Sequence, residues 1–177
     1  MSDFTPATRN SAIWSGDSRK VANGKANEVI LTKQGKLPIP DLSGIEAVQM
    51  GHVFEPVIAN LAQNKLKVEL TKIEDSLTHK KESWFKSHFD YAGTENGQTI
   101  LVECKNYGIH QRNKFDDISN TIPNADMAQL VHETAVFGNC SSRPSRSFIS
   151  SFRCLSATQA CSTLWEAVLT LPETSWG

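Results

Sequence analysis

Three residues near the middle of the chain have side chains that can hold a divalent cation and direct water at a phosphate. Asp90 precedes a turn that contains glycine, and an apolar run, 100–102, leads into Glu103-Cys104-Lys105. Because side chains alternate along a strand, we expect Glu103 and Lys105 on one face and Cys104 on the other. Two carboxylates bind Mg²⁺ or Mn²⁺, and a nearby ammonium orients an attacking water. The pattern is typical of a metal-dependent phosphodiesterase.

Two helices are predicted on either side of this segment in the chain. Apolar residues recur at helical spacing up to Ala62 and predict a helix that starts near Ser43, in which Pro56 favours a kink. A second helix is expected over 126–137, and Gly138 is a natural stop for it. The first of these helices would carry Glu55, and the second would carry Gln129.

Strands are predicted between the two helices. Residues 67–73 alternate between apolar and polar, and 84–91 are predicted to pair with them. Residues 100–105 form the next expected strand. The order of helix, strands and helix predicts an α/β or α+β domain with a mixed central β-sheet flanked by helices.

The N-terminal region offers a candidate binding site for phosphate. A helix is predicted over 18–22 with Ser18 as its N-cap, and another over 27–34 that ends at Gly35. Arg9 and the segment Ser15-Gly16-Asp17-Ser18 offer a cation, hydroxyl groups and the free amides of a helix start. These are groups that bind a phosphate.

Bulk properties are those of an ordinary globular domain. The chain has 177 residues, is 39% hydrophobic and 21% charged, and carries a formal net charge of -1, which neither indicates nor excludes a nucleic-acid partner. No segment is apolar enough to span a membrane, and no secretory signal is visible, so we expect a cytoplasmic protein. The four cysteines form no C-x-x-C pair, which argues against a zinc ribbon and favours reduced thiols.

The composition changes after Gly138. All twelve lysines lie at or before Lys114, whereas the stretch from Asn139 onwards has nine serines and no lysine. The sequence therefore divides into a predicted catalytic domain, 1–138, and an atypical Ser-rich tail, 139–177, in which 157–171 are expected to be helical. A simple explanation is a Ser-rich loop with a terminal helix. The alternative is a changed reading frame near Gly138, which would have replaced native C-terminal strands.

The candidate residues form an ordered series: Glu55 on a helix, then Asp90, then Glu103-x-Lys105 on a strand, then Gln129 on a helix. This series resembles the PD-(D/E)xK nuclease superfamily. Within it, residues 9–138 are similar to the phage lambda-type exonucleases, also called YqaJ-like viral recombinases. The resemblance implies a restriction-endonuclease-like core and a Mg²⁺-dependent deoxyribonuclease.

The resemblance also implies roles for the residues that match. Asp90 and Glu103 would bind the metal together with the backbone carbonyl of Cys104. Lys105 would position the nucleophilic water. Glu55 would lie near a second metal or its waters.

Further roles implied by the resemblance concern the DNA. Gln129 would orient the active site and the scissile phosphate, while Arg9 and Ser18 would lie near a pocket for the 5′-phosphate. The implied substrate is linear double-stranded DNA, degraded from 5′ to 3′ in phage-type recombination. Implied partners are a single-strand annealing protein and two further copies of the chain in a ring-shaped homotrimer.

The sequence departs from the family pattern in two places. The family usually has Pro-Asp-Gly at the first acid, where this chain has Phe89-Asp90-Tyr91, and a Tyr often follows the family's Gln where this chain has His132 and Glu133. Each candidate residue, taken alone, has an ordinary explanation as a solvated charge or amide. Two other functions therefore stay open: a structure-specific or restriction-type endonuclease, and a catalytically inactive DNA-binding relative.

Overall fold

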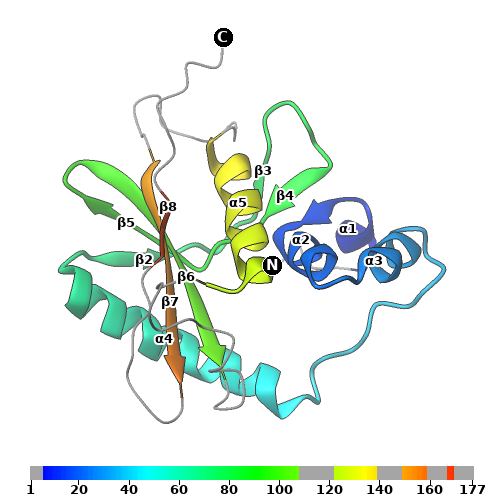
Figure 1. Ribbon diagram of the computed structural model, residues 1–177, viewed down its shortest axis with the longest axis horizontal. Coiled ribbons are helices and arrows are strands. Elements are labelled where there is room, and N and C mark those ends of the chain that lie inside the picture. The colour runs from blue at the N-terminus through cyan, green and yellow to red at the C-terminus, as the bar shows by residue number, and fades with distance from the viewer. Residues whose placement is uncertain (1–5, 108–121, 139–148, 159–166, 170–177) are drawn as a thin grey trace.

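The computed structural model describes residues 6–107, 122–138, 149–158 and 167–169, and Figure 1 shows how they are arranged. The described strands form two sheets, one of five strands and one of three. Helices lie against both sheets, so the predicted mixed α/β architecture is confirmed. The larger sheet carries most of the candidate site.

The five-stranded sheet has the order β2-β5-β6-β7-β8. Its strands are, in chain order, Leu70–Lys72 (β2), Tyr91–Glu95 (β5), Gln98–Tyr107 (β6), Ile149–Thr158 (β7) and Ala167–Leu169 (β8). The pairing of β6 with β7 is parallel, and the other neighbours are antiparallel. A parallel pair needs a crossover connection, and helix α5 (Asn124–Gly138) lies between these two strands in the chain.

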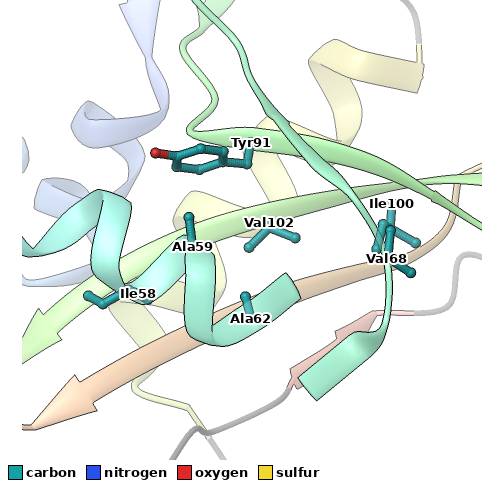
Figure 2. Packing of buried hydrophobic residues seen from close by; sticks show 7 residues of the cluster. All are labelled: Ile58, Ala59, Ala62, Val68, Tyr91, Ile100 and Val102. Atoms are coloured by element: carbon teal, nitrogen blue, oxygen red, sulfur yellow. The ribbon is translucent and has the colours of Figure 1, made fainter. Parts of the chain in front are cut away.

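One face of the sheet is covered by α4 (Glu46–Leu66), which continues through Pro56 as one helix of 21 residues. Its residues Ile58, Ala59 and Ala62 are buried against β6 and its neighbours, as Figure 2 shows. Ile58 and Ala62 are four residues apart and therefore lie on the same side of the helix. In the part of the chain that the structure describes, no helix is long and apolar enough to cross a membrane.

The opposite face of β6 is covered by α5. Leu101 packs there with Phe89, Leu130, Val136 and Phe137 in a second apolar cluster. Leu101 alternates along β6 with Ile100 and Val102, which belong to the α4 side. The period of two along the strand thus divides the core into two layers.

The N-terminal elements lie beside α5 (Figure 1). They are α1 (Pro6–Asn10), β1 (Ile13–Trp14), α2 (Ser15–Ala22) and α3 (Ala26–Lys33). The smaller sheet has the order β1-β4-β3, with β3 at Leu77–Thr78 and β4 at Phe85–Ser87. Helix α2 packs directly against α5 and so connects the N-terminal region with the helix that carries Gln129.

A tight hairpin brings β5 alongside β6. Asn96 and Gly97 both have positive φ, at 52° and 78°, between the paired residues Glu95 and Gln98. An Asn-Gly pair with positive φ at both positions is the favoured two-residue hairpin turn. On β5, a Cβ at Gly93 would come within 2.7 Å of the Glu69 carbonyl oxygen. Only glycine therefore fits at this position beside the segment that contains Glu69.

Two local predictions from the sequence are wrong. Helix α2 begins at Ser15 and not at Ser18, because Asp17 Oδ2 accepts a hydrogen bond from the Trp14 backbone amide at 2.9 Å and fixes an earlier start. Most of the segment 84–91 does not pair with 67–73, because it contains β4, which pairs with β1 and β3. Only its last two residues do so: Tyr91, the first residue of β5, pairs with Lys72, and the Asp90 carbonyl oxygen accepts from the Ile73 amide. The partner of β2 is β5.

The predicted C-terminal helix is also wrong. Residues 157–158 are the end of β7, and residues 167–169 are β8, while the rest of 157–171 lies outside the described residues. The stretch after Gly138 therefore contributes two strands to the five-stranded sheet. Its unusual composition had suggested a separate tail, but composition does not show which backbone groups pair.

Candidate active site

Strand β6 presents Glu103 and Lys105 on the face that α5 covers. Lys105 Nζ donates a hydrogen bond to Glu103 Oε1 at 2.5 Å, and Glu103 is only 5% exposed. Cys104 packs on the other face, with the apolar cluster beneath α4. The expected alternation of these three side chains is confirmed.

Helix α5 adds Gln129 to this pair. Gln129 Nε2 donates to Glu103 Oε1 at 2.6 Å, and Gln129 Oε1 accepts from Lys105 Nζ at 2.9 Å. The carboxylate, the ammonium and the amide thus form a closed triangle between a strand and a helix. Both donors reach the same oxygen of Glu103.

Asp90 joins the site immediately before β5 begins. Its Oδ2 accepts a hydrogen bond from the Cys104 backbone amide at 2.7 Å, which holds the carboxyl group beside the Glu103–Lys105 segment. Burial, followed by the negative charge of Glu103, raises the pKa of Asp90 from 3.8 to about 8. A buried acid whose ionisation is disfavoured by a neighbouring carboxylate is typical of a place where a cation can bind.

Glu55 approaches from α4, on the opposite side of the sheet from Gln129. It forms an ion pair with Lys72 on β2, with 3.0 Å between Nζ and Oε1. Its charge is close enough to contribute to the raised pKa values of both Asp90 and Tyr91. Glu55 therefore lies at the margin of the site, with an electrostatic influence on Asp90.

The predicted phosphate-binding residues lie on separate N-terminal helices. Arg9 is in α1, where its backbone carbonyl accepts a hydrogen bond from Lys33 Nζ at 2.6 Å. Ser18 is in α2, where its hydroxyl group lies 2.8 Å from His132 Nδ1. Their part in phosphate binding stays a prediction.

Side-chain contacts hold α5 in place on both sides of Gln129. Arg19 Nε donates to Asp126 Oδ1 at 2.6 Å, one turn before Gln129. His132 Nε2 lies 2.9 Å from the Lys86 carbonyl oxygen, so this nitrogen carries the proton and Nδ1 accepts from Ser18. Burial lowers the pKa of His132, which favours this neutral form.

Glu133 is a member of the site that the sequence did not identify. It is fully buried and accepts a hydrogen bond from Gln129 Nε2 at 2.9 Å. In the sequence it appeared only as a departure from the family pattern. Its spacing of four residues from Gln129 was the available signal, because side chains four apart on a helix lie on the same side.

The side chains suit a cation that is bound by few protein ligands. Among the described residues, no group of three or more His, Cys, Asp and Glu side chains could hold a metal ion. Asp90 and Glu103 supply two carboxylates, which is the usual protein contribution to a Mg²⁺ site completed by water and phosphate oxygens. The Cys104 side chain is a thiol and not half of a disulfide, and the side chains of the other cysteines lie outside the described residues.

Solved structures show the same fold. The alkaline exonuclease LHK-Exo from Laribacter hongkongensis is similar with a TM-score of 0.68 and 13% identity, over 93% of this chain and 79% of that one. The same enzyme in complex with dAMP has a TM-score of 0.65 and 15% identity, over 93% and 80% of the two chains. These matches confirm the predicted restriction-endonuclease-like fold.

The sequence comparisons identify a family. No curated protein matches the chain. Residues 7–140 match the family described as the YqaJ-like viral recombinase domain, a range that includes every candidate residue of the site. Because the match covers most of the 177 residues, the family predicted from the sequence is confirmed. The chain belongs to the YqaJ-like viral recombinase domain family.

Proposed function

We propose that this chain is a metal-dependent deoxyribonuclease that degrades linear double-stranded DNA from its 5′ ends. One observation carries the proposal: Glu103, Lys105 and Gln129 are joined by direct hydrogen bonds on β6 and α5, and the Cys104 backbone amide holds Asp90 beside them. Membership of a viral recombinase family and the likeness to an alkaline exonuclease support a nuclease.

Mg²⁺ is the proposed cofactor, with Mn²⁺ as a substitute. Asp90 and Glu103 would hold it, together with the backbone carbonyl of Cys104. The raised pKa of Asp90 supports this, because burial and the charge of Glu103 leave the pair in need of a positive partner. When bound, the ion would supply Lewis acidity, which stabilises charge on the scissile phosphate and makes water more acidic.

The remaining residues would position the reactants. Lys105 is held by Glu103 and Gln129, so its ammonium group is fixed where it could orient water for attack on phosphorus. The bond from phosphorus to the 3′-oxygen would break, the 3′-oxygen would take up a proton, and a 5′-phosphorylated nucleotide would leave. Glu55 would act at the edge of the site, where its negative charge raises the pKa of Asp90.

The mode of attack and the partners are further parts of the proposal. Arg9 and Ser18 would bind the terminal 5′-phosphate, which would confine digestion to free ends. The remaining 3′ single strand would be passed to a single-strand annealing protein, and a homotrimer would keep the enzyme on its DNA. These details rest on the family alone.

The test compares two substrates under two conditions. Linear duplex DNA with 5′-phosphates and closed circular plasmid are each incubated with Mg²⁺ and with a chelator, using the wild-type chain and Asp90→Asn. We expect the wild-type chain to degrade the linear DNA but not the plasmid, and to do so with Mg²⁺ but not with chelator. Asp90→Asn should degrade neither DNA. Cleavage of the circle would favour an endonuclease, and no cleavage of either DNA would indicate a DNA-binding relative without activity.

A linear substrate with 5′-hydroxyl ends sharpens the test. If Arg9 and Ser18 bind the terminal phosphate, this DNA should be digested more slowly than the phosphorylated form. Arg9→Ala should slow digestion of the 5′-phosphorylated DNA and leave digestion of the 5′-hydroxyl DNA unchanged, so that the two rates become equal. Equal rates on both ends in the wild-type enzyme would contradict the assigned phosphate pocket while leaving the nuclease proposal intact.

A further inference from the structure

A second buried acid lies behind the candidate site. Glu133 is one helical turn beyond Gln129 on α5, and its side chain has no measurable exposure. Its Oε1 accepts from Gln129 Nε2, whereas its Oε2 has no hydrogen-bond partner among the described residues. A buried carboxyl group is costly, so its presence here calls for a reason beyond packing.

The contact with Glu133 completes the hydrogen bonding of the Gln129 amide. The two N–H groups go to Glu103 Oε1 at 2.6 Å and to Glu133 Oε1 at 2.9 Å, and the carbonyl oxygen accepts from Lys105. A flipped amide would place its oxygen against two carboxyl groups and its N–H groups against an ammonium. With both acids as acceptors, only one orientation of the amide satisfies every partner.

We propose that Glu133 is a positioning residue, which fixes the Gln129 amide so that Gln129 in turn holds Glu103 and Lys105 in their reactive arrangement. The inference rests on the proposed nuclease function and adds to it a residue that does not touch DNA or metal. Glu133 acts through Gln129, whose amide donates to it at 2.9 Å; the other side chain whose hydrogen bonding favours its charged form is Ser15, at the start of α2.

The protonation state of Glu133 is compatible with this role. Burial, followed by the charge of Glu103, raises its pKa, and the hydrogen bond from Gln129 opposes that rise. A neutral carboxylic acid can place its carbonyl oxygen against Gln129 and its hydroxyl group on Oε2. A glutamine at position 133 has the same shape and offers the same acceptor, so it is the conservative replacement.

Enzyme kinetics on linear DNA with saturating Mg²⁺ test the role. Glu133→Leu should lower kcat about 10-fold or more, with little change in KM, which is typical of losing a group that orients the reacting residues. Glu133→Gln should retain most of the wild-type kcat. Wild-type kcat in Glu133→Leu, or an equal loss in both variants, would overturn the inference.

Thr134→Val is the matched control on the same helix. Thr134 is buried and its hydroxyl group bonds only to the Leu130 carbonyl oxygen, at 2.7 Å, among the contacts that the structure describes. This variant should lose stability but keep its kcat per folded molecule. If it lost as much kcat as Glu133→Leu, the effect would reflect general disturbance of α5, and the inference would fail.

A measurement without activity separates this inference from the proposed function. In ¹⁵N NMR spectra, the side-chain amide of Gln129 is assigned by its disappearance in Gln129→Leu. Both of its protons should exchange slowly with solvent in the wild-type chain and Glu133→Gln, and one should exchange much faster in Glu133→Leu. Fast exchange in the wild type would refute the inference; slow exchange in a chain that cuts no DNA would refute only the nuclease proposal.

Discussion

The two faces of β6 are built from alternate residues of the same strand, yet they have different properties. On the α4 face, Ile100 and Val102 are almost fully buried among apolar side chains (Figure 2). On the α5 face, Leu101 begins a similar apolar layer, but the next residue on that face is Glu103 and the one after it is Lys105. The helices differ in the same way, since α4 presents alanines and isoleucine where α5 presents an amide and a carboxyl group.

The difference shows how the fold can support charged groups in its interior. The α4 face supplies the free energy that comes from removing apolar surface from water. Part of that stability offsets the cost of the buried acids, since burial and the negative charge of Glu103 raise the pKa values of Asp90 and Glu133. Stability and chemistry are therefore carried by opposite sides of one strand.

The largest expected effect comes from the charged face. Asp90→Asn keeps an oxygen that can accept from the Cys104 amide but removes the negative charge. If the site works through a bound cation, cleavage should fall about 1000-fold or more, because several kcal/mol of charge stabilisation are lost. The measurement is the rate of digestion of linear DNA with Mg²⁺, and circular dichroism checks that the fold is kept. Near-normal cleavage would show that the site has been assigned wrongly.

Ile100→Ala is the corresponding change on the apolar face. Ile100 is fully buried, so its truncation should reduce the free energy of unfolding by about 2–5 kcal/mol. Chemical denaturation measures the loss, and cleavage per folded molecule should stay near the wild-type value at low temperature. A large loss of cleavage in a folded Ile100→Ala protein would contradict the statement that the α4 face supplies stability and the α5 face supplies the chemistry.

Lys105→Met separates positioning from metal binding. Lys105 contacts Glu103 and Gln129, so its loss should disturb the orientation of water more than the hold on the cation. We expect kcat to fall about 100-fold, a loss of about 2.7 kcal/mol, while the Mg²⁺ concentration needed for half-maximal rate changes little. Titration with Mg²⁺ checks both quantities. Equal losses in rate and in metal affinity would assign Lys105 to the metal site instead.

The smallest effect, taken for a change of one pH unit, is a dependence of stability on pH in the absence of metal. Asp90 has a pKa near 3.8 when unfolded and about 8 when folded, so the folded chain binds more protons between these values. Its stability should therefore fall as the pH rises through this window, by up to about 1.4 kcal/mol per pH unit from this group. Denaturation with chelator at several pH values should show a shallower fall in Asp90→Asn than in the wild type. Parallel curves would contradict the raised pKa.

The sequence predicted those parts of the site that follow from local periodicity. Alternation along a strand was enough to place Glu103 and Lys105 together and Cys104 apart from them. Helical spacing and the stop at Gly138 located α5, whose observed range, Asn124–Gly138, is slightly longer than predicted. The ordered series of acids and Gln129 indicated the family, which is confirmed over residues 7–140.

What the sequence did not predict depends on contacts between distant segments. The start of α2 is decided by Asp17, and the pairing of β2 with β5 could not be read from either strand alone. The contact of Glu133 with Gln129 is local, but its burial follows from the tertiary packing around α5. A changed reading frame after Gly138 stays a prediction, which the coding DNA would test: another frame should encode alternating apolar strands.

The parallel pairing of β6 with β7 has a consequence for the chain while it is being made. Strand β7 lies far beyond β6 in the sequence and pairs with it from Thr99 to Tyr107. Until β7 has left the ribosome, β6 is the edge of the sheet, and one row of its N–H and C=O groups is open to any other strand. The segment that carries Glu103 and Lys105 is thus among the last parts of the sheet to be enclosed during synthesis, and this interval is when a nascent chain of this fold is most exposed to aggregation.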